Sequence, residues 1–174
     1  CFDSSVSHAR AAAFRPLIDL LKAYFGVASG DSDRRLREKV LGKLVTLNES
    51  LRGSATPILA LLDVQLDDTS WLEMDPAERR RTTLEVCRTL ILQEAQVQPL
   101  IIIFEDLHWV DAETQAFLDL LVGSLGRTPL LVLFNCPPEY SDPWIGKSYH
   151  THIRIDPLPQ ASGEEMLADA PDLD

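Results

Sequence analysis

Apolar residues recur at spacings of three and four through the first half of the chain, which predicts amphipathic helices. Such stripes occupy residues 15–27, 31–53, 56–64 and 75–96. The last of them begins with two start signals, Asp75 as helix cap and Pro76 at the first helical position. We therefore expect residues 1–98 to be mostly helical, with a polar connection at residues 65–74.

The second half of the chain shows continuous apolar runs that alternate with turns. "LIIIF" and "TPLLVLFN" are typical of buried strands in a parallel sheet. Between them, Asp111 is expected to cap a helix that Gly126 closes. "THIRIDPLP" predicts a third, weaker strand, and "SGEEMLAD" predicts the start of another helix. This order predicts an α/β fold, with the strands in residues 99–160 and a following helix or linker in residues 161–174.

Two acids, Glu105 and Asp106, follow directly after the first apolar run. The carboxyl end of a parallel strand faces the crevice where ligands bind. One carboxylate there can hold Mg²⁺ through its waters, and the other can orient an attacking water or accept its proton. The next run ends on Asn135, and neighbouring parallel strands finish side by side, which would put its amide near Asp106. Nucleotide chemistry is one interpretation, and polar residues that merely open turns are the other.

A nucleotide site also needs a loop that holds the phosphates, and its pattern is GxxxxGK[ST] between a strand and a helix. "SDPWIGKS", residues 141–148, matches the final G-K-S of that pattern. However, Ser141 occupies the position of the first glycine, and Pro143 stiffens a loop that must expose successive N–H groups. The residues that follow alternate like a strand and offer no helix N-terminus. We therefore expect no phosphate loop in this sequence.

The composition narrows the range of partners. Sixteen basic and twenty-seven acidic residues give a formal net charge of −11, whereas nucleic-acid binding requires a basic face. No apolar run approaches the roughly 20 residues that span a bilayer. The three cysteines lie far apart without a CxxC pair, so free thiols in a reducing compartment are expected. These features predict a cytoplasmic protein that binds neither nucleic acid nor membrane.

A family resemblance rests on "PLIIIFEDLHWVDAETQAFLDLLVGSL" followed by "TPLLVLFNCPPEY". These strings resemble the second half of an ATPase module of the AAA/STAND type. Similar modules stand beside bacterial class III adenylate/guanylate cyclase domains and occur in large LuxR-type regulators. The resemblance extends over nearly the whole chain, and "EDLHWVD" is its most specific part. It implies a P-loop NTPase-like parallel sheet flanked by helices, in an ATPase module that regulates an output domain of the same parent chain, such as a nucleotide cyclase.

The resemblance also implies roles for single residues. Glu105 and Asp106 correspond to the Walker B pair, in which Glu105 holds Mg²⁺ through water and Asp106 acts in catalysis. Asn135 corresponds to the catalytic sensor residue on the neighbouring strand. All three residues are implied to bind Mg²⁺ and ATP in the intact protein. His108 and Trp109 match the usual "HW" of the family, and from the residues alone we expect a Trp packed under the next helix and a His oriented by the turn.

The chain departs from the family pattern in three ways. The Walker A strand, loop and helix are expected to precede Cys1, so the chain resembles a truncated module that binds no Mg·ATP tightly. Pro137 replaces an Arg that relatives often carry, which favours the alternative of a degenerate, non-hydrolysing interaction scaffold. Glu105 replaces the commoner Asp. A metal-dependent hydrolase built on Glu105, Asp106 and His108 is a third hypothesis, disfavoured because no further ligands cluster nearby in sequence.

The truncation has an expected structural consequence. In this fold class the strand before the Walker A loop lies centrally, between the sensor strand and the last strand. Without it, "LLVLFN" and "THIRID" lose their shared neighbour. We therefore expect a gap in the sheet, a different pairing of these strands or a strand supplied by a partner. An open central edge would be an aggregation hazard.

Overall fold

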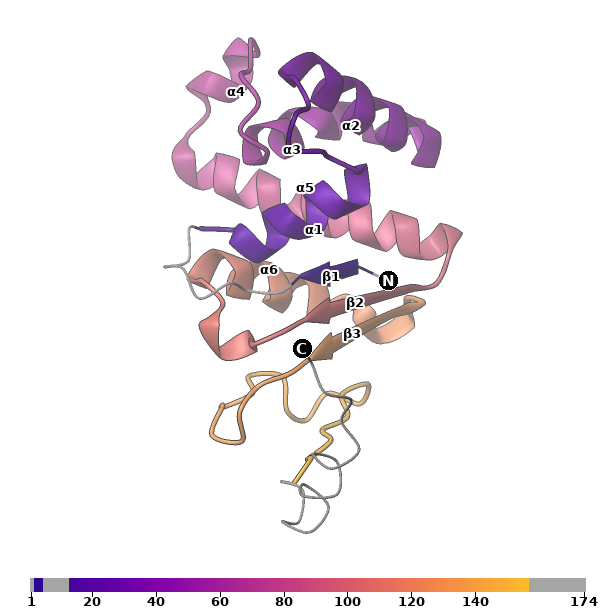
Figure 1. Ribbon diagram of the computed structural model, residues 1–174, viewed down its shortest axis with the longest axis vertical. Coiled ribbons are helices and arrows are strands. Elements are labelled where there is room, and N and C mark those ends of the chain that lie inside the picture. The colour runs from indigo at the N-terminus through magenta and orange to yellow at the C-terminus, as the bar shows by residue number, and fades with distance from the viewer. Residues whose placement is uncertain (1, 5–12, 157–174) are drawn as a thin grey trace, which may run out of the picture. The chain divides into compact units, whose positions relative to one another are not determined.

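The computed structural model describes the backbone of residues 2–4 and all of residues 13–156 (Figure 1). The chain divides into two compact units, residues 1–143 and 144–174. All helices and strands of the described residues belong to the first unit, whose fold is α/β with a small parallel sheet. None of the helices described is long and apolar enough to cross a membrane.

The sheet consists of three parallel strands in the order β1 (Phe2–Ser4), β2 (Leu100–Phe104) and β3 (Leu130–Phe134). Leu100 pairs with Leu130 and Phe104 pairs with Phe134, so β2 and β3 end side by side. The two strands predicted from apolar runs, and their parallel pairing, are confirmed.

The helices in chain order are α1 (Arg15–Phe25), α2 (Asp33–Leu47), α3 (Ala55–Leu61), α4 (Thr69–Glu73), α5 (Pro76–Val97) and α6 (Ala112–Val122). The predicted start of α5 is confirmed, because the Asp75 carboxylate accepts hydrogen bonds from the N–H groups of Ala77 and Glu78. The predicted polar connection at residues 65–74 is wrong in part. Asp68 caps the short helix α4 there, and Trp71 on that helix is buried.

Two helix ends and one strand also differ from expectation. Helix α2 ends at Leu47, before the expected end of the helical stripe at residue 53. Asn48 has an extended backbone and caps a 3₁₀ helix over Glu49–Ser54. Helix α6 ends at Val122, with Gly123 as its C-cap, whereas Gly126 lies in the next 3₁₀ turn. The third predicted strand is wrong over residues 151–156, which form no regular structure. The rest of "THIRIDPLP" and the helix expected from "SGEEMLAD" lie outside the described residues.

The two faces of the sheet have different surroundings. Leu100, Ile102 and Phe104 of β2 are buried, and the first two line a cavity with side chains of α1 and α5. On the opposite face Ile101, Leu131 and Leu133 are 43%, 50% and 44% exposed. We call this second surface, formed by Ile101, Ile103, Leu131 and Leu133, the open face.

Chain direction explains the open face. Consecutive strands advance one way through β1, β2 and β3, and right-handed crossovers then place every connecting helix on the same side of the sheet. The predicted packing of helices on the sheet is confirmed for one face. The prediction of buried strands is wrong for the open face, because among the described residues helices cover only the other face.

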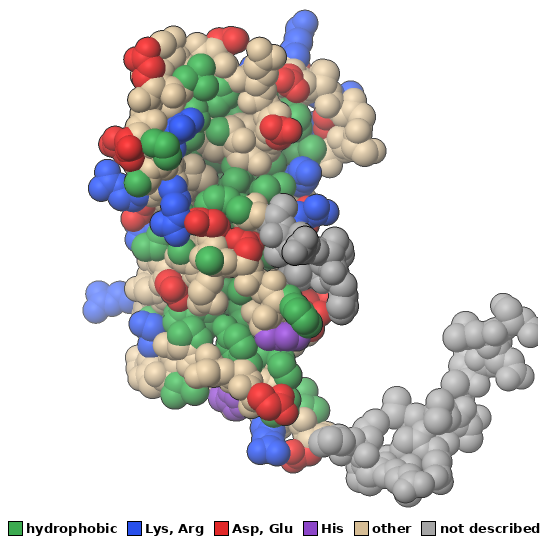
Figure 2. Space-filling model, turned by 90° about the vertical axis from the view of Figure 1, so that its left-hand side faces the viewer, with side chains coloured by type: hydrophobic (Ala, Val, Ile, Leu, Met, Phe, Trp, Pro, Cys, Tyr) green, Lys and Arg blue, Asp and Glu red, His purple; other side chains and the backbone are tan. Residues whose placement is uncertain are grey.

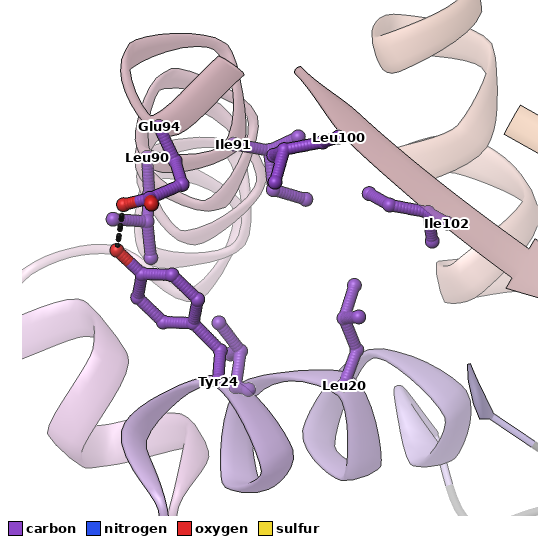
Figure 3. A pocket seen from close by; sticks show the side chains of 8 residues that line it. Leu20, Tyr24, Leu90, Ile91, Glu94, Leu100 and Ile102 are labelled. Carbon is purple, nitrogen blue, oxygen red and sulfur yellow. Dashed lines mark hydrogen bonds between the residues drawn. The ribbon is translucent and has the colours of Figure 1, made fainter. Parts of the chain in front are cut away.

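A small cavity of about 20 Å³ lies where α1 and α5 meet β2 (Figure 3). Its lining is apolar except for Tyr24 of α1 and Glu94 of α5. The Tyr24 hydroxyl donates to the Glu94 carboxylate at 2.6 Å, and Gln98 Nε2 donates to the second oxygen of that carboxylate. Burial and this hydrogen bond raise the pKa of Tyr24 above its ordinary value. The buried acid thus has two donors, and the one from Tyr24 joins α1 to α5.

Replacing Tyr24 by phenylalanine is expected to lower the free energy of unfolding by about 1–3 kcal/mol, because buried Glu94 loses a donor. The folded protein holds the Tyr24 proton more tightly than the unfolded chain does. The contribution of the protonated Tyr24 hydroxyl to the free energy of unfolding is therefore complete below pH ~10. It is lost as the pH rises further. Urea denaturation of wild type and Tyr24→Phe from pH 7.5 to 11 should show their difference narrowing at the alkaline end.

Tyr140→Phe is the matched control for this loss at pH 7.5, because the Tyr140 hydroxyl makes only a long bond of 3.5 Å to Gln115. A difference between wild type and Tyr24→Phe that stays constant up to pH 11 would contradict the proposed role of the Tyr24 proton.

Candidate functional site

The acid pair lies where β2 ends, at the carboxyl edge of the sheet. Glu105 and Asp106 are both half-buried. Asp106 adopts a left-handed backbone with φ 53° and ψ 48°, a conformation that Asp and Asn tolerate better than most residues. This conformation turns the chain out of the strand and into the 3₁₀ turn Leu107–Trp109. The sharp turn leaves both carboxylates at the end of the strand.

Asn135 lies beside Asp106, as predicted from the parallel strands. Its side-chain Oδ1 accepts a hydrogen bond from the backbone N–H of Asp106. The backbones join as well, because Asn135 N–H donates to the Phe104 carbonyl at 3.2 Å and Leu107 N–H donates to the Asn135 carbonyl at 3.0 Å. Since Oδ1 faces a donor, the side-chain NH₂ of exposed Asn135 is the group that can donate to a phosphate or a water.

The donor set at this edge fits a magnesium ion only in part. Mg²⁺ in nucleotide sites takes one or two carboxylates together with waters and phosphate oxygens. Glu105 and Asp106 supply two carboxylates, and the described residues contain no group of three or more His, Cys, Asp or Glu side chains that could hold a metal. The pair therefore suits Mg²⁺ that arrives with a nucleotide. The hydrolase hypothesis built on these acids and His108 gains no support.

His108 and Trp109 lie at the surface, with ring centroids 5.0 Å apart. Trp109 is 57% exposed, so the prediction that it packs under the following helix is wrong. Leu107 takes the inward position and is 2% exposed. The tight 3₁₀ turn explains the exchange, because it directs its first residue toward the core and the next two residues outward.

Asp111 caps α6, as predicted, and also binds a distant part of the backbone. Its Oδ1 accepts hydrogen bonds from the N–H groups of Glu113 and Thr114 at 3.0 Å and of Phe14 at 3.1 Å. Its Oδ2 accepts from the Thr114 hydroxyl at 2.7 Å. Burial alone would raise the pKa of this carboxyl, but the hydrogen bonds outweigh burial and lower the pKa. Sequence reasoning found the cap and missed the contact with Phe14, because no periodicity relates residues so far apart.

The "SDPWIGKS" segment does not form a phosphate loop in the part of the chain that the structure describes. Residues 143–146 and 148–149 form turns, and Gly146 has a φ of 96°. No helix begins between these turns and residue 156. The backbone therefore lacks the helix N-terminus on which such a loop relies.

The structure thus brings Glu105, Asp106 and Asn135 together at one edge of the sheet. Pro137 follows two residues after Asn135 and is half-buried. The side chains that would hold the phosphates of a nucleotide are not found among the described residues near this edge. In comparisons with known proteins, no family model, no curated protein and no solved structure matches this chain.

Proposed function

We propose that this chain is part of an ATP-binding regulatory module of the P-loop NTPase type, resembling AAA/STAND modules. The observation that carries the proposal is the hydrogen bond between Asp106 N–H and Asn135 Oδ1, which holds an acid and an amide at the end of neighbouring strands. In this proposal Glu105 binds Mg²⁺ through water and Asp106 orients the attacking water. Asn135 donates from its side-chain NH₂ to the terminal phosphate.

The strand order supports this assignment. Among the described residues no further strand pairs with β3, and the open face carries no helix. A further strand would cover the free edge of β3, and a further helix would cover the open face. In P-loop modules these are the positions of the strand and helix that flank the phosphate loop. We infer that the phosphate loop belongs to a part of the protein outside this sequence, and that the output domain does as well.

Electrostatics sets a condition on the nucleotide. The two carboxylates would repel the phosphates of free ATP, and the chain as a whole carries a formal charge of −11. Basic side chains are scattered over the side of the molecule in Figure 2 and do not gather into one patch. Binding therefore requires Mg²⁺ to lie between the acids and the phosphates. We expect ATP in the presence of EDTA not to bind.

A non-hydrolysing interaction scaffold with the same fold is the second candidate. Pro137 favours it, because relatives often carry an Arg at this position that can face the phosphates. The open face also favours it, since exposed apolar surfaces mark contacts with other proteins. ATP binding without turnover would distinguish the scaffold from the hydrolysing module.

Calorimetric titration of Mg·ATP tests the proposal. The 174-residue chain is compared with the natural chain extended upstream by a further strand, loop and helix. We expect binding to the longer chain only, lost in EDTA and reduced by Glu105→Ala. Binding to neither chain would overturn the nucleotide proposal and favour the scaffold. Tight binding to the shorter chain would mean that residues 141–148 form a phosphate loop after all.

A further inference from the structure

One carboxylate, that of Asp111, joins the turn after the acid pair to the beginning of α1. It caps α6 through Glu113 and Thr114, and it accepts the backbone N–H of Phe14, which precedes α1. An aspartate cap needs only the first two contacts. We call the third contact, between the Asp111 carboxylate and Phe14 N–H, the Asp111 latch. It links parts of the chain 97 residues apart.

Residues 105–110 connect the candidate site to the latch along the backbone and are held by hydrogen bonds of their own. Trp109 N–H donates to the Asp106 carbonyl at 2.8 Å, and Asp106 N–H donates to Asn135. Leu107, between them, is buried and also bonded to the Asn135 backbone. The acid turn, residues 105–110, is thus held by Asn135 at its start and by Asp111 just after its end.

Backbone strain is concentrated at the two ends of this path. Phe14 has a φ of 64° and Asp106 a φ of 53°, and the only other described non-glycine residue with positive φ is Asp63. Left-handed backbone is unfavourable for a residue with a side chain, so neighbouring contacts must hold it in place. At Phe14 the latch is one such contact. Release of the latch therefore allows Phe14 to relax, and the acid turn loses its anchor at the same time.

We propose that Asp111 is a positioning residue that couples the geometry of the acid turn to the start of α1 through the latch. The inference rests on the proposed function for its consequence, because Mg·ATP at Glu105 and Asp106 would hold the turn and so keep the latch closed. Coupling of this kind is reciprocal, so a change at either end of the path alters the stability of the other.

Amide hydrogen exchange of the 174-residue chain, without nucleotide, tests the coupling. Asp111→Ser keeps a good helix cap but is too short to hold both α6 and Phe14. We expect exchange to accelerate about tenfold or more at Phe14 and several-fold at Leu107 and Trp109. We expect Asp111→Asn, which retains the acceptor oxygen, to restore both regions to within about threefold of wild type.

Asp75→Ser is the matched control, because Asp75 caps α5 in the same way, and its side chain accepts no hydrogen bond from other described residues. It should leave exchange at Phe14 and in the acid turn unchanged, and the middle of α5 should exchange alike in all variants. Faster exchange at Phe14 with an unaltered acid turn would overturn the coupling and leave Asp111 a purely structural cap. Because no nucleotide is present, this result is independent of whether the chain binds ATP.

Discussion

Replacing Phe104 by alanine is expected to lower the free energy of unfolding by about 3–5 kcal/mol. Phe104 is the last residue of β2 and is fully buried on the helix-covered side of the sheet. Its ring stacks on that of Phe134, with centroids 6.0 Å apart. Removing the ring leaves a cavity in the core at the end of β2, one residue before the acid pair. Urea denaturation of the 174-residue chain measures the loss.

Leu133→Ala is the matched control, because Leu133 lies on the neighbouring strand but points to the open face and is 44% exposed. Its loss should be about 1 kcal/mol or less, since an exposed side chain gives up little burial. Comparable losses at Phe104 and Leu133 would contradict the one-sided sheet, because they would mean that both faces are packed.

Replacing Asp106 by asparagine in the upstream-extended chain is expected to lower ATP turnover by about 10²–10⁴-fold, the usual effect of losing a general base. The backbone N–H that Asn135 accepts is unchanged, and asparagine tolerates the left-handed conformation of this position. ATP should therefore still bind. Glu105→Ala is expected instead to weaken the Mg²⁺ dependence of binding, because Glu105 is the proposed metal ligand.

Asp63→Asn is the control for this substitution. Asp63 is exposed and has a φ of 60°, so the same chemical change is made at another left-handed aspartate away from the sheet edge. Steady-state hydrolysis should be unaffected in Asp63→Asn. Undiminished hydrolysis in Asp106→Asn would remove Asp106 from the chemistry.

The parts of the structure that sequence reasoning predicted are those with a local or periodic cause. Asp75 and Pro76 mark the start of α5 because capping needs only adjacent residues. The meeting of Asp106 and Asn135 was predictable because parallel strands that pair in register end at the same edge. The first prediction depends on adjacent residues and the second on the regular pairing of parallel strands.

The features that were missed depend on contacts between distant segments or on which elements pack around a residue. An apolar run such as "LIIIF" predicts a strand buried on both faces, but which face is covered depends on the handedness of the connections. Trp109 was expected inside because tryptophan is large and apolar, whereas the 3₁₀ turn places Leu107 there. The bond from Phe14 to Asp111 leaves no mark in the sequence, because a backbone donor can belong to any residue.

Amide chemical-shift mapping on the upstream-extended chain shows whether Glu105, Asp106 and Asn135 line an ATP site. With Mg·ATP, we expect the largest changes at the backbone amides of these three residues and at the side-chain NH₂ of Asn135, and none with ATP in EDTA. Changes centred on residues 146–148, or saturation with Mg·ATP that leaves Glu105, Asp106 and Asn135 unaltered, would contradict the proposed site.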